Sequence, residues 1–235
     1  MVDLIEPTRH LSMFDPTVFG DRRVDILGCG ASGSHVGQEF GRLGILNLHL
    51  WDFDNVEAHN IANQLYPQAA IGRNKASILG SLLSVATGIE PTIHEVRCAG
   101  PAETVEDELG EVVVFCMDSM SARMSVAEDR LKMNNVTQLV IDTRMGVEEL
   151  RIYNFNPNRN AEWKRWAATI TPDEETQENA CQTRTTIGGT AAIAAGLATH
   201  QFLQWYRRVI VRDNQYGDLP FEITMMLRPN FVSTR

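Results

Sequence analysis

The chain has 235 residues, of which 43% are hydrophobic and 22% are charged, and its net charge at pH 7 is −9. These values are ordinary for a globular protein, and the length favours one α/β domain with appendages around one core. Because the net charge is negative, we expect neither nucleic acid nor an anionic membrane to be the main partner, since both carry negative charge themselves.

The ends of the chain and its cysteines point to a cytoplasmic protein. The first 16 residues carry acids and prolines where a signal peptide would have an apolar run. The longest apolar stretch, residues 187–199, is shorter than the roughly 20 residues that span a membrane. No two cysteines form a CxxC pair, so we expect no structural zinc.

Predicted strands and helices alternate along the chain. Strands are predicted near residues 23–27, 46–51, 91–97, 111–116, 137–142 and 149–155. Helices are predicted near residues 31–43, 73–87, 101–109, 119–134 and 187–208. Short β-branched runs such as residues 112–115 are typical of strands that are buried on both faces. The pattern predicts a Rossmann-like, doubly wound α/β fold with a mainly parallel sheet and flanking helices.

We divide this single predicted domain, residues 1–235, into four parts. An N-terminal arm (1–22) precedes a nucleotide-binding core (23–155), a long crossover loop (156–185) and a C-terminal helix and strand (186–235). The crossover loop is polar except for Trp163 and Trp166. A connection this long in a compact domain is usually functional, so we interpret it as a lid over the nucleotide side of the sheet. A surface loop is the alternative, but two tryptophans three residues apart favour docking against the fold.

A glycine-rich loop, residues 28–33, follows the first predicted strand and begins the first predicted helix. Gly28 is expected to form the tight turn, Gly30 to let a phosphate approach the backbone, and Gly33 to allow close helix packing. The helix start at Ala31 and Ser32 would offer free N–H groups to the phosphate. The alternative is a tight strand-to-helix turn that binds no ligand.

Acidic residues follow the second predicted strand. Asp52 lies at the strand end, where such folds hold ribose hydroxyls, and it is the stronger candidate. Asp54 is either a second nucleotide contact or a turn residue.

Four motifs in this order resemble the ThiF/MoeB superfamily of ubiquitin-activating-type adenylyltransferases. They are GCGASGS at 28–34, WDFDNVEAHNIANQ at 51–64, GRNKA at 72–76, and CMD at 116–118 followed by Arg123. The likeness covers residues 9 to about 125 and weakens beyond. It implies an enzyme that uses ATP and Mg²⁺ to adenylate a carboxylate, commonly the C terminus of a ubiquitin-like β-grasp protein.

The resemblance also assigns roles to individual residues. Lys75 would place its charge on the transferring phosphate, a suitable role for a flexible ammonium group. Asp118 would hold Mg²⁺ at the carboxyl edge of the sheet. Asn60 and Gln64 would contact the nucleotide, and Arg9 would reach the γ-phosphate bound by the partner subunit of a homodimer. Each role has an alternative. Lys75 could be a solvated lysine in the first turn of a helix, and Arg9 could be a surface arginine. Asp118 could be a helix N-cap, although Ser119 could cap the helix instead.

Two further positions bear on activity. Asn63 stands where relatives usually carry a phosphate-binding arginine, so either Arg73 or another basic residue compensates, or the site is weakened. Cys181 matches a cysteine that several relatives use to receive an acyl group or sulfur, and an inert thiol is the alternative.

Two other functions remain open at this point. A nicotinamide- or flavin-linked oxidoreductase would use the glycine loop but leaves Asn60, Lys75 and Asp118 without a joint purpose. A catalytically weakened scaffold or partner subunit would account for Asn63. The motifs do not distinguish a protein tail, a peptide and a small carboxylate as the substrate.

Overall fold

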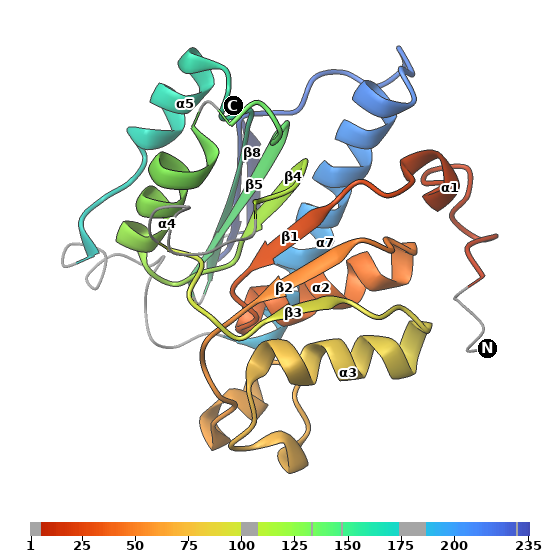
Figure 1. The fold of residues 1–235 in the computed structure, drawn as a ribbon. Helices are drawn as coiled ribbons and strands as arrows, with labels where there is room; N and C mark the ends of the chain where they lie inside the picture. Colours follow the sequence, from red (N-terminus) through yellow and green to blue (C-terminus); the bar gives the residue numbers. More distant parts are fainter. Residues whose placement is uncertain (1–5, 100–107, 133, 147, 174–186, 229) are drawn as a thin grey trace.

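The computed structural model describes residues 6–99, 108–132, 134–146, 148–173, 187–228 and 230–235. These residues form one sheet between two layers of helices (Figure 1). The strand order is β3-β2-β1-β4-β5-β6-β7-β8. The bounds are β1 (Val24–Leu27), β2 (Leu48–Trp51), β3 (Thr92–His94), β4 (Val112–Phe115), β5 (Leu139–Met145), β6 (Glu149–Phe155), β7 (Glu222–Leu227) and β8 (Asn230–Thr234).

The half of the sheet from β3 to β5 is parallel. The chain runs outward from β1 through β2 to β3, then returns to the other side of β1 as β4 and β5. All residues of β1, β2 and β4 are buried, as expected for strands covered on both faces. This arrangement confirms the doubly wound, mainly parallel α/β prediction. The order in which the strands are added reverses direction beside β1, and such a reversal opens a crevice at the carboxyl ends of the strands.

The other half of the sheet is antiparallel and differs from the prediction in two places. Strand β5 continues past the predicted end at residue 142 to Met145, because Arg144 pairs with Arg151 of β6 in an antiparallel ladder. The C-terminal part forms two strands, β7 and β8, where one was predicted. Both differences arise from strand pairing, which depends on residues that are distant in the chain.

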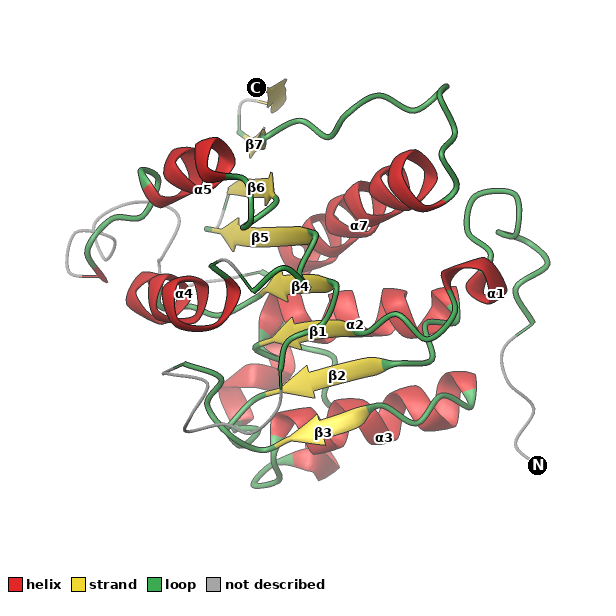
Figure 2. Cartoon of the chain, turned by 45° about the horizontal axis from the view of Figure 1, so that its top comes forward, coloured by secondary structure: helices red, strands yellow, loops and turns green. Residues whose placement is uncertain are grey.

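Helices cover both faces of the sheet (Figure 2). One face carries α2 (Ala31–Leu43), α3 (Lys75–Thr87) and α7 (Gly188–Trp205), and the other carries α4 (Met120–Val126) and α5 (Asn160–Ala167). The short elements are α1 (Pro16–Phe19), the 3₁₀ helices η1 (Ala58–Ala62) and η2 (Gln68–Ala70), and the π-helical turns η4 (Ala127–Leu131) and η5 (Tyr206–Ile210). The helix predicted for 101–109 falls largely on residues 100–107, outside the described part. Within the described ranges, no helix is long and apolar enough to cross a membrane.

The first part of the predicted crossover loop forms helix α5. Trp163 and Trp166 are both buried, and the ring of Trp166 stacks on Phe155 with centroids 4.7 Å apart. The surface-loop alternative is therefore wrong for residues 160–167, which dock on the sheet as the two tryptophans indicated. Residues 174–185 of the predicted loop lie outside the described residues.

The N-terminal arm packs against the end of α7. The ring centroids of Phe14 and Tyr206 are 4.7 Å apart, and those of Phe19 and Phe202 are 5.4 Å apart. Residues 14–19 are thereby anchored to the helix layer that also contains α2.

Candidate active site

A cavity of about 1160 Å³ lies at the carboxyl ends of β1, β2, β4 and β5. The predicted residues that line it are Gly28, Gly30, Ala31, Ser32, Asp52, Asp54, Asn60, Gln64, Lys75 and Asp118. Asn63, the position that departs from the family pattern, lines it as well. Residues spread over 90 positions of the sequence therefore share one cavity.

The glycine loop has the turn geometry that was predicted. Gly28 has a φ of +92°, which side-chain-bearing residues rarely adopt. A Cβ at Gly33 would lie 1.8 Å from the carbonyl oxygen of Gly28, so only glycine allows the helix to start so close to the strand. A Cβ at Gly30 would have no atom within 4 Å, because this residue faces the cavity. The space beside Gly30, next to the N-terminus of α2, fits an anion such as a phosphate.

Asp52 ties the glycine loop to the end of β2. Its carboxylate accepts hydrogen bonds from the backbone N–H of Cys29 at 2.7 Å and of Asp54 at 2.8 Å. Burial raises the pKa of Asp52, and the two backbone N–H donors oppose that shift. A carboxylate has acceptor sites for more than two donors. Asp52 therefore has the position and the acceptor capacity to hold ribose hydroxyls.

Lys75 is the first residue of α3 and is buried at the cavity. Its Nζ lies 3.2 Å from Oδ2 of Asp54. The neighbouring Asn74 fixes the start of the helix, since its side chain accepts a bond from Ser77 N and donates one to the Asp52 carbonyl oxygen. The alternative of a solvated lysine is therefore wrong. Asp54 holds the ammonium group of Lys75 at the cavity, a role that the sequence did not indicate.

Asn60 and Gln64 come from the segment after β2. The Oδ1 of Asn60 accepts a hydrogen bond from Glu57 N at 2.8 Å and so caps η1. The Oε1 of Gln64 is buried and has no hydrogen-bond partner among the described residues. A buried acceptor without a donor is unfavourable unless a ligand or water satisfies it. Its position suits a ligand that brings a donor into the cavity.

Sequence reasoning missed Tyr66, which holds this segment against the glycine loop. Its hydroxyl donates to the Cys29 carbonyl oxygen at 2.5 Å. Burial raises its pKa, so the hydroxyl keeps the proton that it donates. The one sequence signal for this contact was that Tyr66 follows the motif at residues 51–64 by two positions.

Asp118 emerges from β4 as an exposed residue on the cavity wall. The N-cap of α4 is Ser119, whose Oγ accepts a bond from Ala122 N at 3.0 Å. The alternative that Asp118 caps this helix is therefore wrong. Of the described residues, no group of three His, Cys, Asp or Glu could hold a metal ion. Mg²⁺ is usually held by one or two carboxylates together with substrate phosphates, so Asp118 fits that role.

Among the predicted residues that the structure describes, Gly33, Arg73 and Arg9 do not line this cavity. Arg73 is exposed, and its backbone bonds to Val56 and Ala70. Arg9 is exposed on the N-terminal arm. Cys181 lies outside the described residues. Among the described residues, the Lys and Arg side chains that line the cavity are Lys75, Arg97, Arg123 and Arg144.

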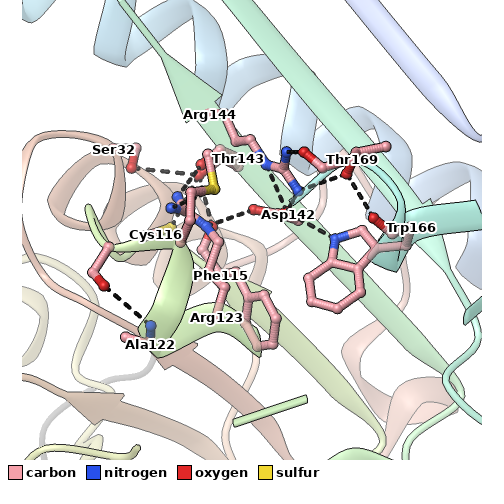
Figure 3. A network of polar contacts seen from close by, with 12 residues as sticks. Ser32, Phe115, Cys116, Ala122, Arg123, Asp142, Thr143, Arg144, Trp166 and Thr169 are labelled. Atoms are coloured by element: carbon pink, nitrogen blue, oxygen red, sulfur yellow. Dashed lines mark hydrogen bonds and ion pairs between the residues drawn. The ribbon is translucent and has the colours of Figure 1, made fainter. Parts of the chain in front are cut away.

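A buried charge cluster, which the sequence did not reveal, forms the cavity wall at β5 (Figure 3). Asp142 accepts hydrogen bonds from Arg123 Nε at 2.9 Å, from Arg144 Nη2 at 2.7 Å and from Trp166 Nε1 at 2.9 Å. The two guanidinium groups outweigh the burial of Asp142 and lower its pKa. Arg144 also donates to the Thr169 carbonyl oxygen at 2.9 Å. The sequence signals were an acid within an apolar predicted strand and Arg123 after the CMD motif, and neither indicated that the two would pair.

The fold and the cavity together define a Rossmann-like α/β protein whose cavity combines a glycine-rich turn, a strand-end carboxylate and a buried lysine. Residues 19–219 match the ThiF family, and the chain belongs to this family. No curated protein matches the chain.

Two solved proteins illustrate the similarity of fold. MccB from E. coli, crystallised with ATP, is 17% identical with a TM-score of 0.70, over 94% of this chain and 65% of that chain. PaaA is 16% identical with a TM-score of 0.67, over 94% of this chain and 74% of that chain. The present chain thus spans less than two thirds of the length of MccB. Other MccB structures contain MccA, in one case with AMPCPP.

Proposed function

We propose that the protein uses ATP to adenylate the C-terminal carboxylate of a polypeptide. One observation carries the proposal: the open space at Gly30, the carboxylates of Asp52 and Asp118, and the ammonium of Lys75 all face the same cavity. An oxidoreductase would need only the space at Gly30 and the carboxylate of Asp52, and it would leave Asp118 and Lys75 without a role. The MccB structures with ATP and with MccA support a polypeptide substrate.

In this mechanism the protein binds the substrates and neutralises their charge, and it forms no covalent bond in the adenylation step. Asp52 accepts hydrogen bonds from the ribose hydroxyls, and the N–H groups of Ala31 and Ser32 donate hydrogen bonds to phosphate oxygens. A carboxylate oxygen of the substrate attacks the α-phosphorus, the bond to the bridging oxygen breaks, and pyrophosphate leaves. Lys75 neutralises charge that develops on the phosphates. Mg²⁺ held by Asp118 would supply further neutralisation.

Three finer assignments rest on the family resemblance. The substrate would be a ubiquitin-like β-grasp protein, with a short peptide as the competing class. Arg9 would act on the nucleotide of a second subunit in a homodimer, which its exposed position allows. Cys181 would receive the acyl group, so a thiol-sensitive conjugate should form and should be absent in Cys181→Ala.

ATP–pyrophosphate exchange tests the proposal. We expect exchange that depends on an added β-grasp protein or peptide, and a loss of about 100-fold or more in Lys75→Ala and in Asp118→Ala. Arg73→Ala is the matched control, because this cation lies outside the cavity lining, and it should retain the exchange rate.

The possible outcomes separate the three functions. No ATP binding by the wild-type protein would contradict adenylation. ATP binding without exchange would favour the weakened subunit that Asn63 suggests, and tight binding of a dinucleotide instead would favour the oxidoreductase. Exchange that survives both substitutions would contradict our roles for Lys75 and Asp118.

A further inference from the structure

The cluster at β5 holds more positive than negative charge. Arg123 and Arg144 are 3% and 5% exposed and share a single carboxylate, that of Asp142, which is fully buried. Among the described residues no other ion pair reaches either guanidinium. Within the described part of the chain, Nη1 of Arg123 donates only to the sulfur of Met120, a weak acceptor 3.8 Å away, while Nη2 donates to the Thr143 carbonyl oxygen. One buried positive charge therefore lacks a counter-charge, which is costly unless an anion binds beside it.

The cavity gives such an anion access. Both arginines line it, as does Thr143 between Asp142 and Arg144. Arg144 is held in place by Asp142 and Thr169 and by the ring of Tyr153, whose centroid lies 4.4 Å from its Cζ. The two guanidinium groups are thus positioned before any ligand arrives, which lowers the entropic cost of binding.

The strand order separates this cluster from Asp52, the proposed ribose acceptor. Asp52 follows β2, the glycine loop follows β1, and the cluster lies on β5, two strands beyond the glycine loop. Neighbouring strands are about 4.8 Å apart, so β5 lies about 14 Å from the strand that carries the ribose acceptor. At its near edge the cluster meets the glycine loop, because Oγ1 of Thr143 donates to Oγ of Ser32 at 3.4 Å. A nucleotide with its ribose on Asp52 and its phosphates at Gly30 leaves the β5 end of the cavity to the acyl substrate.

We infer that Arg123 and Arg144 select a substrate with a second carboxylate close to the one that is activated. This inference rests on the proposed adenylation and assigns its substrate specificity. The arginines hold the neighbouring carboxylate, for example that of an acidic C-terminal residue, and so aim the reacting carboxylate at the α-phosphate. Asp142, Thr143 and Thr169 take up some but not all of the five N–H donors on each guanidinium. The remaining donors can form charge-assisted hydrogen bonds to a carboxylate, which are stronger than neutral ones.

The test compares N-acetylaspartate with N-acetylasparagine, which share the α-carboxylate and differ in the side-chain charge. Binding of each is measured by calorimetry to the protein saturated with AMPCPP, whose own binding is measured first. We expect the wild-type protein to bind the aspartate derivative at least about tenfold more tightly, as charge-assisted hydrogen bonds imply. Arg144→Gln should lose this preference, and Arg144→Lys should keep part of it. Arg151→Gln should keep all of it, because Arg151 lies opposite Arg144 on β6 but does not line the cavity.

Several results would overturn the inference. One is equal binding of the two derivatives by a wild-type protein that binds AMPCPP, an outcome that leaves the proposed function intact. Another is an Arg144→Gln variant that keeps the full preference for N-acetylaspartate over N-acetylasparagine. If the glutamine variant does not fold, an Arg144→Lys variant with the full wild-type preference would overturn the inference instead. A loss of AMPCPP affinity in both Arg144 variants as large as the loss of N-acetylaspartate binding would reassign the cluster to phosphate. Failure of the wild-type protein to bind AMPCPP contradicts the proposed function itself.

Discussion

Gly33→Ala is expected to unfold the protein, whereas Gly30→Ala is expected to leave it folded but unable to bind nucleotide well. A methyl group at Gly33 would lie 1.8 Å from the carbonyl oxygen of Gly28 and 2.8 Å from its carbonyl carbon. These are backbone atoms at the end of the central strand β1, so they cannot move aside without disturbing the sheet. We expect a loss of at least about 3 kcal/mol in the free energy of unfolding, measured by urea denaturation.

Gly30 is the matched control in the same loop. A methyl group there would meet no atom within 4 Å, and the residue has a negative φ as the N-cap of α2. Replacing an N-cap glycine with alanine should cost no more than about 1 kcal/mol. The methyl group would occupy the space next to the free N–H groups of α2, so AMPCPP affinity should fall at least about tenfold. Unchanged affinity in a folded Gly30→Ala variant would contradict phosphate binding at this loop.

The second large effect is expected for Asp142→Asn, which removes the carboxylate that pairs with both Arg123 and Arg144. Breaking a buried ion pair by removing one partner commonly costs 3–5 kcal/mol, because the remaining charge stays buried without compensation. We expect a loss of about that size at pH 7 in urea denaturation. The control is Asp218→Asn, since Asp218 is 91% exposed in its pair with Arg208 and should matter by less than about 0.5 kcal/mol.

The pH dependence gives an independent check on the same residue. The pKa of Asp142 is lowered in the folded protein, so its ionised form favours folding. The stability difference between wild type and Asp142→Asn should therefore be complete above about pH 4, the usual pKa of an unfolded aspartate, and should shrink as the pH falls below it. A difference that is constant from pH 7 to pH 3 would mean that the ionisation of Asp142 does not stabilise the fold.

The parts of the site that follow directly from local sequence were predicted well. The glycine loop and Asp52 lie at the ends of short apolar runs, and such runs become buried parallel strands because only apolar residues fit between two helix layers. The positions of Gly28 and Gly33 were likewise predictable, since their backbone requirements are set within a six-residue turn.

The parts that depend on distant contacts were missed or only partly seen. The predicted strand ended at residue 142, yet β5 continues to Met145 because β6 pairs with it. The same continuation brings Arg144 next to Asp142, and α4 brings Arg123 to the other side. The pairing of Lys75 with Asp54 likewise joins the start of α3 to the end of β2.

The sequence by itself determined the fold class, the ThiF family and the place of the glycine loop and Asp52 at the strand ends, because glycine geometry and strand-end carboxylates leave a local pattern. The tertiary structure alone decided the charge cluster on β5, the contact of Trp166 with Asp142 in that cluster, and the pairing of the C-terminal antiparallel strands. These features arise where segments far apart in the chain bury polar or aromatic groups against each other. Such burial is stable only when partners satisfy it, and a linear pattern does not specify which partners meet.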